Sequence, residues 1–93
     1  MPSSMKISTV DLRLFAAIAD LGGITAAARK LGLTKSLVSR ELANLEDRLG
    51  TRLVQRTTRK VSLTDTGELL ATYARRIVEE MDNAEAAIEA TRE

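Results

Sequence analysis

The sequence contains no cysteine and no histidine among its 93 residues. Without cysteine it can form neither a disulfide framework nor a thiolate metal site, and the absence fits a reducing cytoplasm. Without histidine it lacks the commonest general base and metal ligand. No convergent set of acidic residues suggests another catalytic site. We therefore expect a protein that is not an enzyme and that uses no metal and no cofactor.

Aromatic residues and long apolar runs are also scarce. Only Phe15 and Tyr73 are aromatic, so we expect an aliphatic core of Leu, Ile, Val and Ala. No apolar run approaches the roughly 20 residues that span a bilayer, and the N-terminus lacks a signal-peptide pattern. These absences predict a cytoplasmic protein with no membrane partner. A single domain of this length buries a limited core and gains stability from a partner.

Charge is divided unevenly along the chain, although the net charge is only +1. Residues 25–62 carry nine basic and three acidic side chains, whereas residues 63–93 carry three basic and eight acidic ones. A basic middle and an acidic tail suggest two surfaces with different roles. The alternative is ordinary solvated surface charge.

Glycines and apolar spacing divide the first 50 residues into three helices. Ser8 or Thr9 can cap the first, and the glycine pair 22–23 stops it. The second is short, begins at Thr25, is rich in alanine and ends at Gly32. The apolar residues of the first helix recur at helical spacing: Val10, Leu14, Phe15, Ile18 and Leu21.

A tight turn leads into the third helix. In this turn Gly32 can adopt a positive φ, Leu33 can bury itself between helices, and Thr34 can cap the helix that follows. That helix is predicted from about Lys35 to Leu49, and Gly50 closes it. Its apolar stripe consists of Leu37, Val38, Leu42, Leu45 and Leu49.

Residues 52–63 lose the helical period. Leu53, Val61 and Leu63 flank a polar stretch, and two short β-capable runs around a tip rich in Thr and Arg predict a small hairpin. No Asn-Gly or Asp-Gly turn marks the tip.

A long helix follows the hairpin. Thr64 can cap it, Asp65 lies in the first turn where the helix dipole favours an acid, and neither Gly nor Pro follows Gly67. Apolar residues recur along it at nearly heptad spacing: Leu70, Tyr73, Ile77, Met81, Ala84 and Ile88. This stripe predicts a homodimer interface. The alternative is that the stripe packs back on its own domain.

These elements together predict a mainly α fold. Residues 1–64 are expected to form a winged helix-turn-helix, with three helices and a short β-hairpin, and residues 65–93 a long linker or dimerisation helix. The second helix of a helix-turn-helix can enter the major groove of DNA with its N-terminal residues facing base edges. The basic middle of the chain therefore becomes a candidate DNA-binding surface.

The residue types on that surface suit nucleic acid. Lys and Arg donate to guanine or phosphate, Ser hydroxyls suit several bases, free N–H groups at helix starts bind phosphate, and Arg can enter a narrow minor groove. The predicted DNA-binding residues are Thr25, Thr34, Lys35, Ser36, Ser39, Arg40, Arg56, Thr58, Arg59 and Lys60. Taken singly, several of them could instead be ordinary solvated side chains. Arg48 and Arg52 are expected to be surface or ion-pair residues, and Glu46 to be structural.

Several segments resemble the N-terminal domain of LysR-type transcriptional regulators. The matching residues are Thr25-Ala26-Ala27-Ala28-Arg29-Lys30-Leu31, Val38-Ser39-Arg40, Leu45-Glu46-Asp47-Arg48-Leu49-Gly50-Thr51-Arg52-Leu53 and Arg56. Asp11–Phe15 and Leu63–Gly67 are also similar, so the resemblance covers about residues 8–90. Lys35-Ser36 departs from the Gln-Pro that is frequent in the family, so a base preference cannot be carried over at that point.

The resemblance implies a winged helix-turn-helix whose linker helix pairs in dimers. It implies base reading by Lys35, Ser36, Ser39 and Arg40, and a minor-groove contact by the wing around residues 56–60. It also implies a C-terminal effector-binding domain, which these 93 residues do not contain. We therefore expect a truncated form in which a small-molecule effector acts only through the missing domain, and either a dimer or a tetramer for the full-length protein.

The function expected from the sequence is specific binding of double-stranded DNA, as a transcription regulator, by a homodimer on a roughly palindromic operator. One rival is a protein-interaction module in which the acidic long helix is the functional surface. Another is a non-specific architectural DNA binder, which a specificity ratio would distinguish. A small enzyme is disfavoured by the missing His and Cys.

Overall fold

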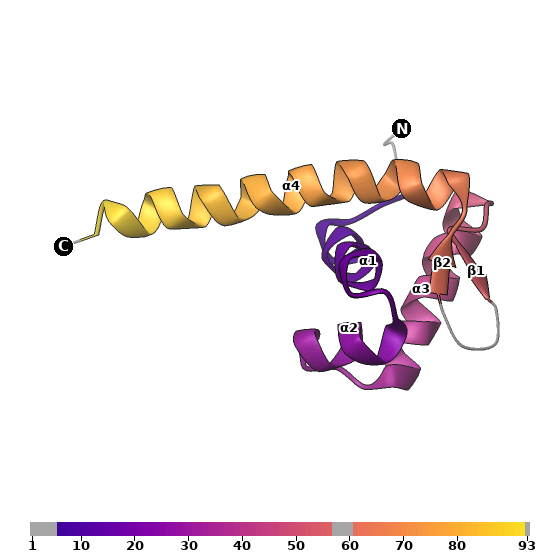
Figure 1. Ribbon diagram of the computed structural model, residues 1–93. Helices are drawn as coiled ribbons and strands as arrows, with labels where there is room; N and C mark the ends of the chain where they lie inside the picture. The colour runs from indigo at the N-terminus through magenta and orange to yellow at the C-terminus, as the bar shows by residue number, and fades with distance from the viewer. Residues whose placement is uncertain (1–5, 57–60, 93) are drawn as a thin grey trace.

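The computed structural model describes residues 6–56 and 61–92, which contain four helices and one two-stranded sheet (Figure 1). Three shorter helices and the hairpin group together, and the last helix lies across them and extends far beyond (Figure 1). The elements are α1 Thr9–Leu21, α2 Ile24–Leu31, α3 Lys35–Leu49, β1 Val54–Arg56, β2 Val61–Leu63 and α4 Asp65–Ala90. This is the mainly α winged helix-turn-helix with a long last helix that the sequence predicted.

Helix α1 begins at a complete capping box and is buried on more than one face. Ser8 accepts a hydrogen bond from the Asp11 backbone N–H, and the Asp11 carboxylate accepts one from the Ser8 N–H. The predicted apolar stripe is wrong at both ends, because Val10 is 73% exposed and Leu21 is also exposed. Leu12 and Ala16 are buried instead, because α4 covers a second face of α1.

The helix-turn-helix follows the predicted order with two local corrections. Helix α2 begins at Ile24, one residue before the predicted Thr25, and Gly23 is its N-cap. Leu33 is 39% exposed and is not buried between helices. Thr34 caps α3 as predicted and accepts a hydrogen bond from the Leu37 N–H at 3.1 Å.

The core joins all three short helices to the hairpin and to α4. Its largest fully buried side chain is Phe15, so the core is aliphatic except at its centre, while Tyr73 is exposed. The main cluster consists of Leu14, Phe15, Ala17, Ile18, Ala27, Ala28, Val38, Leu42, Leu45, Leu53, Val54 and Ala71. Every helix and β1 contribute to it, so the domain has one continuous apolar centre.

Glu46 connects the end of α3 to the start of the hairpin. It is 6% exposed, and one carboxylate oxygen accepts hydrogen bonds from the Leu53 and Val54 backbone N–H groups at 2.8 and 3.2 Å. Arg52 lies 3.9 Å from the other oxygen. The predictions that Glu46 is structural and Arg52 an ion-pair residue are confirmed.

Helix α4 is tied to the base of the hairpin at its first turn. The Thr64 hydroxyl accepts from the Gly67 N–H and donates to the Arg52 carbonyl, while the Thr64 N–H donates to the Leu53 carbonyl. Gly67 lies so close to Leu53 that an added Cβ would overlap the Leu53 carbonyl oxygen. Only glycine allows this approach, which fixes where α4 starts.

Arg48 ties the end of α3 to the start of α1. Its guanidinium donates two hydrogen bonds to the Asp11 carboxylate, at 2.9 and 3.2 Å, and one to the Lys6 carbonyl. The expected ion-pair role of Arg48 is thereby confirmed. The Arg48 hydrogen bond lowers the pKa of Asp11 despite the opposing effect of its burial, and the bond from Ser8 lowers it further.

Within the described ranges, 6–56 and 61–92, no helix is both long enough and apolar enough to cross a membrane.

Replacing Glu46 tests the link between α3 and the hairpin. Glu46→Ala leaves two buried N–H groups without their acceptor, so we expect a loss of about 2–4 kcal/mol in the free energy of unfolding. Glu46→Gln keeps one acceptor oxygen, so its free energy of unfolding should fall clearly less than that of Glu46→Ala. Urea unfolding followed by circular dichroism measures both, and equal losses would contradict the role given to these two bonds.

Acid unfolding tests the Asp11–Arg48 pair. The pKa of Asp11 is lowered in the folded chain, so its contribution to stability is present above the ordinary value of about 3.9 and is lost as pH falls through the folded value. We expect Asp11→Asn to be less stable than the unsubstituted chain at neutral pH, with the difference shrinking below about pH 4.

Urea unfolding between about pH 3 and pH 7 would measure this difference. On an Arg48→Met background the same Asp11→Asn substitution should have little pH-dependent effect, since the favourable partner is gone. A difference between the two chains that stays constant with pH would refute this account.

Candidate nucleic-acid interface

The first two turns of α3 present a polar, basic face to solvent. Lys35, Ser36 and Arg40 are exposed and Ser39 is half-buried, whereas Val38 between them is fully buried. Lys35 and Ser39, and Ser36 and Arg40, are four positions apart, and residues at that spacing are neighbours on the surface of a helix. The four predicted base-reading residues are therefore together on one face.

The charges on this face are not neutralised by the rest of the described chain. In residues 6–56 and 61–92 no ion pair joins Lys35 or Arg40 to an acid. The first turn of α3 also carries the positive end of the helix dipole and contains no acidic residue. Such a surface attracts phosphate and offers donors to base edges.

Thr25 and Thr34 stand at the starts of two consecutive helices. Thr34 is exposed and caps α3. Thr25 is exposed in the first turn of α2, whose N-cap Gly23 provides no side-chain oxygen for the first N–H groups. Backbone N–H groups without a capping side chain are suited to a phosphate oxygen.

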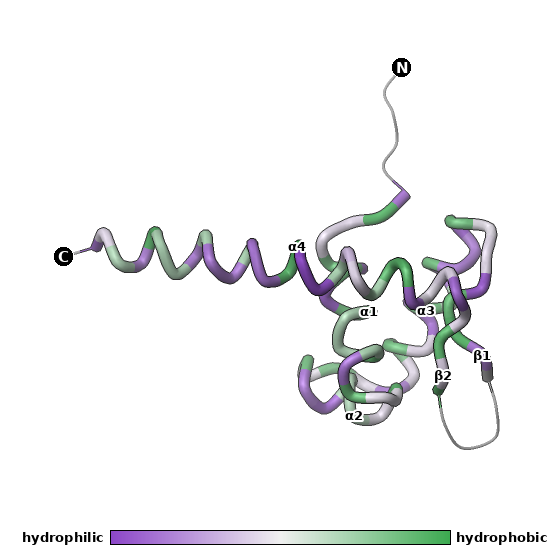
Figure 2. Tube along the Cα trace, turned by 45° about the horizontal axis from the view of Figure 1, so that its top comes forward, coloured by the Kyte–Doolittle hydropathy of each residue, from purple (hydrophilic) through white to green (hydrophobic). Residues whose placement is uncertain are grey.

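The wing is a short antiparallel hairpin in which Val54 pairs with Leu63 and Arg56 with Val61. The end of β1 and the start of β2 lie on the same side of the domain as the start of α3, away from α4 (Figures 1 and 2). The side chain of Arg56 and the whole of Thr58, Arg59 and Lys60 lie outside the described residues, so their DNA contacts stay predictions.

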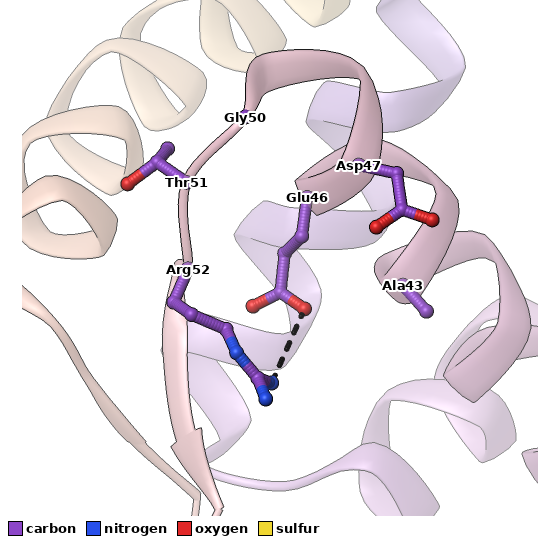
Figure 3. A pocket seen from close by; sticks show the side chains of 6 residues that line it. All are labelled: Ala43, Glu46, Asp47, Gly50, Thr51 and Arg52. Atoms are coloured by element: carbon purple, nitrogen blue, oxygen red, sulfur yellow. Dashed lines mark ion pairs between the residues drawn. The ribbon is translucent and has the colours of Figure 1, made fainter.

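A hollow lies at the C-terminal end of α3, beside the chain that leads into the hairpin. Figure 3 shows the Glu46 carboxylate turned toward the chain that leads into β1, with Arg52 folded back against it and Asp47 turned away. The other lining residues are Ala43, Gly50 and Thr51. No group of three potential metal ligands occurs within residues 6–56 and 61–92.

The exposed apolar residues of α4 form a line along its free side. Figure 2 shows apolar and polar residues alternating along α4 where it extends past the other helices. We call this line the α4 stripe; its members are Leu69, Tyr73, Ile77, Met81, Ala84 and Ile88, of which Met81 is half-buried and the others exposed. The five members that the sequence predicted for a dimer interface stay predictions.

Leu70, the sixth predicted interface residue, differs from the other five. It is half-buried and packs against both core clusters of its own domain. Leu69 is 61% exposed and continues the line at a spacing of four from Tyr73. Heptad spacing fits Leu70 as well as Leu69, so the sequence pattern gave no reason to choose Leu69, and only the position of α1 distinguishes the two.

Known proteins share both the sequence and the shape of this domain. The family model described as bacterial regulatory helix-turn-helix protein, lysR family, matches residues 9–68. The transcriptional regulator PtxR of Pseudomonas aeruginosa is 51% identical over 73 residues, which are 78% of this chain and 23% of PtxR. CrgA of Neisseria meningitidis is 40% identical over 81 residues, which are 87% of this chain and 27% of CrgA.

Two solved structures resemble the fold over nearly the whole chain. A complex of the BenM DNA-binding domain with catB site 1 DNA has a TM-score of 0.83, 29% identity, and coverage of 94% of this chain and 100% of that one. A CbnR DNA-binding domain–DNA complex has a TM-score of 0.78, 31% identity, and coverage of 92% and 100%. This chain therefore belongs to the LysR family of bacterial regulatory helix-turn-helix proteins.

Proposed function

We propose that this chain binds double-stranded DNA sequence-specifically, as the DNA-binding part of a transcription regulator. The observation that carries the proposal is the outward face at the start of α3, where Lys35, Ser36, Ser39 and Arg40 lie together on a capped helix. Similarity to the BenM and CbnR domains, both of which were solved with DNA, supports the same assignment. The start of α3 would lie in the major groove and the wing would reach the minor groove.

The dimer is the second part of the proposal. The α4 stripe is a line of apolar side chains, most of which the rest of the domain leaves exposed. A second copy of α4 packed along this line would remove it from water. Residues 1–64 would then serve as the DNA-reading unit and residues 65–93 as the pairing unit. A dimer places two recognition helices on two half-sites about one helical turn apart, which is why a roughly palindromic operator is expected.

The chain spans about a quarter of the length of PtxR and CrgA. We infer that the whole protein carries a further domain through which a small-molecule effector acts, that it works in the cytoplasm as a dimer or tetramer, and that it has no catalytic activity of its own.

Selection of bound duplexes from a random DNA pool at two salt concentrations tests this function. We expect a two-fold motif with half-sites about one helical turn apart, recovered at both concentrations, with weaker total binding at the higher one. Binding without any motif would replace the proposal with a non-specific binder. No binding at either concentration would favour a protein-interaction module.

Among the residues at the start of α3, Arg40 is the one whose replacement we expect to change base recognition most. We expect Arg40→Ala to weaken binding to the selected site by about 1–3 kcal/mol and to relax base preference at one position of each half-site. Arg92→Ala, which removes an equal charge far from α3, is the matched control. Competition titrations with point-substituted duplexes measure both, and an unchanged base preference in Arg40→Ala would refute base reading by this residue.

A further inference from the structure

The contact between α1 and α4 has a small apolar centre flanked by two ion pairs. At the centre Ala74 is fully buried against Leu12 and Ala16, with Leu70 and Val78 at its edges. Arg13 donates to Asp82 at 2.8 Å, and Arg75 donates to Asp20 at 2.6 Å. We call these two contacts the α1–α4 ion pairs.

Ala16 and Ala74 bring the two helices close together, and only a few larger apolar side chains surround them, so this small contact offers limited resistance to a change in the angle between the helices. The α1–α4 ion pairs add to that resistance, because their residues are seven positions apart on each helix, about 10 Å along each axis. Thr64 and Gly67 anchor the start of α4, and the two ion pairs lie further along the helix, where they oppose a swing of α4 about that anchor. The pairs are about half exposed, so their contribution to folding stability is small.

The angle between α1 and α4 determines where the far end of α4 lies, because no polar contact of the described chain joins α4 to the rest of the domain beyond Asp82. Within the described chain, every hydrogen bond and ion pair of α4 beyond Asp82 stays within α4 and its C-terminal turn. The helix runs unbroken from Asp65 to Ala90. Ile88 is 14 residues beyond Ala74, about 21 Å, so a swing of about 10° moves it by about 4 Å, comparable with the ~3.4 Å rise of one base pair.

We propose that the α1–α4 ion pairs, Arg13–Asp82 and Arg75–Asp20, set the spacing between DNA half-sites that the dimer accepts. This inference rests on the proposed function, since it needs two copies joined through the α4 stripe on a two-part operator. The four residues act as positioning residues and do not touch DNA. They fix the angle between each DNA-reading unit and its own α4, and so the distance between the two recognition helices.

The test uses the whole chain and duplexes in which the selected half-site is repeated with spacers of every length across one helical turn. The test variant is Asp20→Ala with Asp82→Ala. The matched control is Asp47→Ala with Glu89→Ala, which removes two other exposed acids without touching the contact between α1 and α4. A third variant exchanges the acid and the base within each pair. It keeps both attractions with the charges on α1 and α4 reversed, and its substitutions are Arg13→Asp, Asp82→Arg, Asp20→Arg and Arg75→Asp.

We expect the unsubstituted chain and the control to prefer one spacing. In the test variant the preference for that spacing over its nearest neighbours should fall by about threefold or more, while affinity for a single half-site changes less than about twofold. The exchanged variant should recover the preference. Thermal unfolding verifies that all variants are folded, which the exposure of the four side chains leads us to expect.

Two results would overturn the inference in distinguishable ways. A folded test variant with the same spacing profile as the unsubstituted chain would show that the ion pairs do not set the spacing, and the proposed function would stand. An unsubstituted chain that selects no two-part site would remove the proposed function, and the inference with it.

Discussion

The carboxylate of Glu46 is the point at which the two halves of this small domain are joined. Buried at the end of α3, it accepts hydrogen bonds from the Leu53 and Val54 N–H groups, where the chain enters the hairpin. The Leu53 carbonyl in turn accepts from Thr64, which starts α4. The position of the wing relative to α3, and the point where the long helix starts, therefore depend on this one carboxylate, whose buried oxygen has hydrogen-bond donors.

The proposed DNA-binding surface and the proposed pairing surface lie on opposite sides of this framework. The start of α3, the end of β1 and the start of β2 lie on one side, and α4 crosses the other (Figure 1). Such a division lets one element contact a nucleic acid while another contacts a second copy, with no side chain needed for both. The uneven charge of the chain matches it, with a basic middle and an acidic tail.

Local signals were sufficient for most of the secondary structure. Thr34, Gly50 and Thr64 each have the predicted capping role, because a cap depends on residues within one turn of the chain. Errors arose where a distant element decides. Val10 and Leu21 fit a helical stripe but are exposed, and Leu12 and Ala16 are buried because α4 lies on them. A smaller, local error is the start of α2, which was predicted at Thr25 and lies one residue earlier, at Ile24.

The sequence by itself determined the element order, the caps, the family and the polar residues at the start of α3, because all of these depend on neighbouring residues and on periodicity. Only the tertiary structure decided which side of α4 is free. Leu69 and Leu70 are adjacent and alike in the sequence, yet one is exposed and the other packs on the core. It also brought Arg13 to Asp82 and Arg75 to Asp20, pairs more than fifty positions apart. The physical reason is that an ion pair across two helices depends on their crossing angle, which no local pattern encodes.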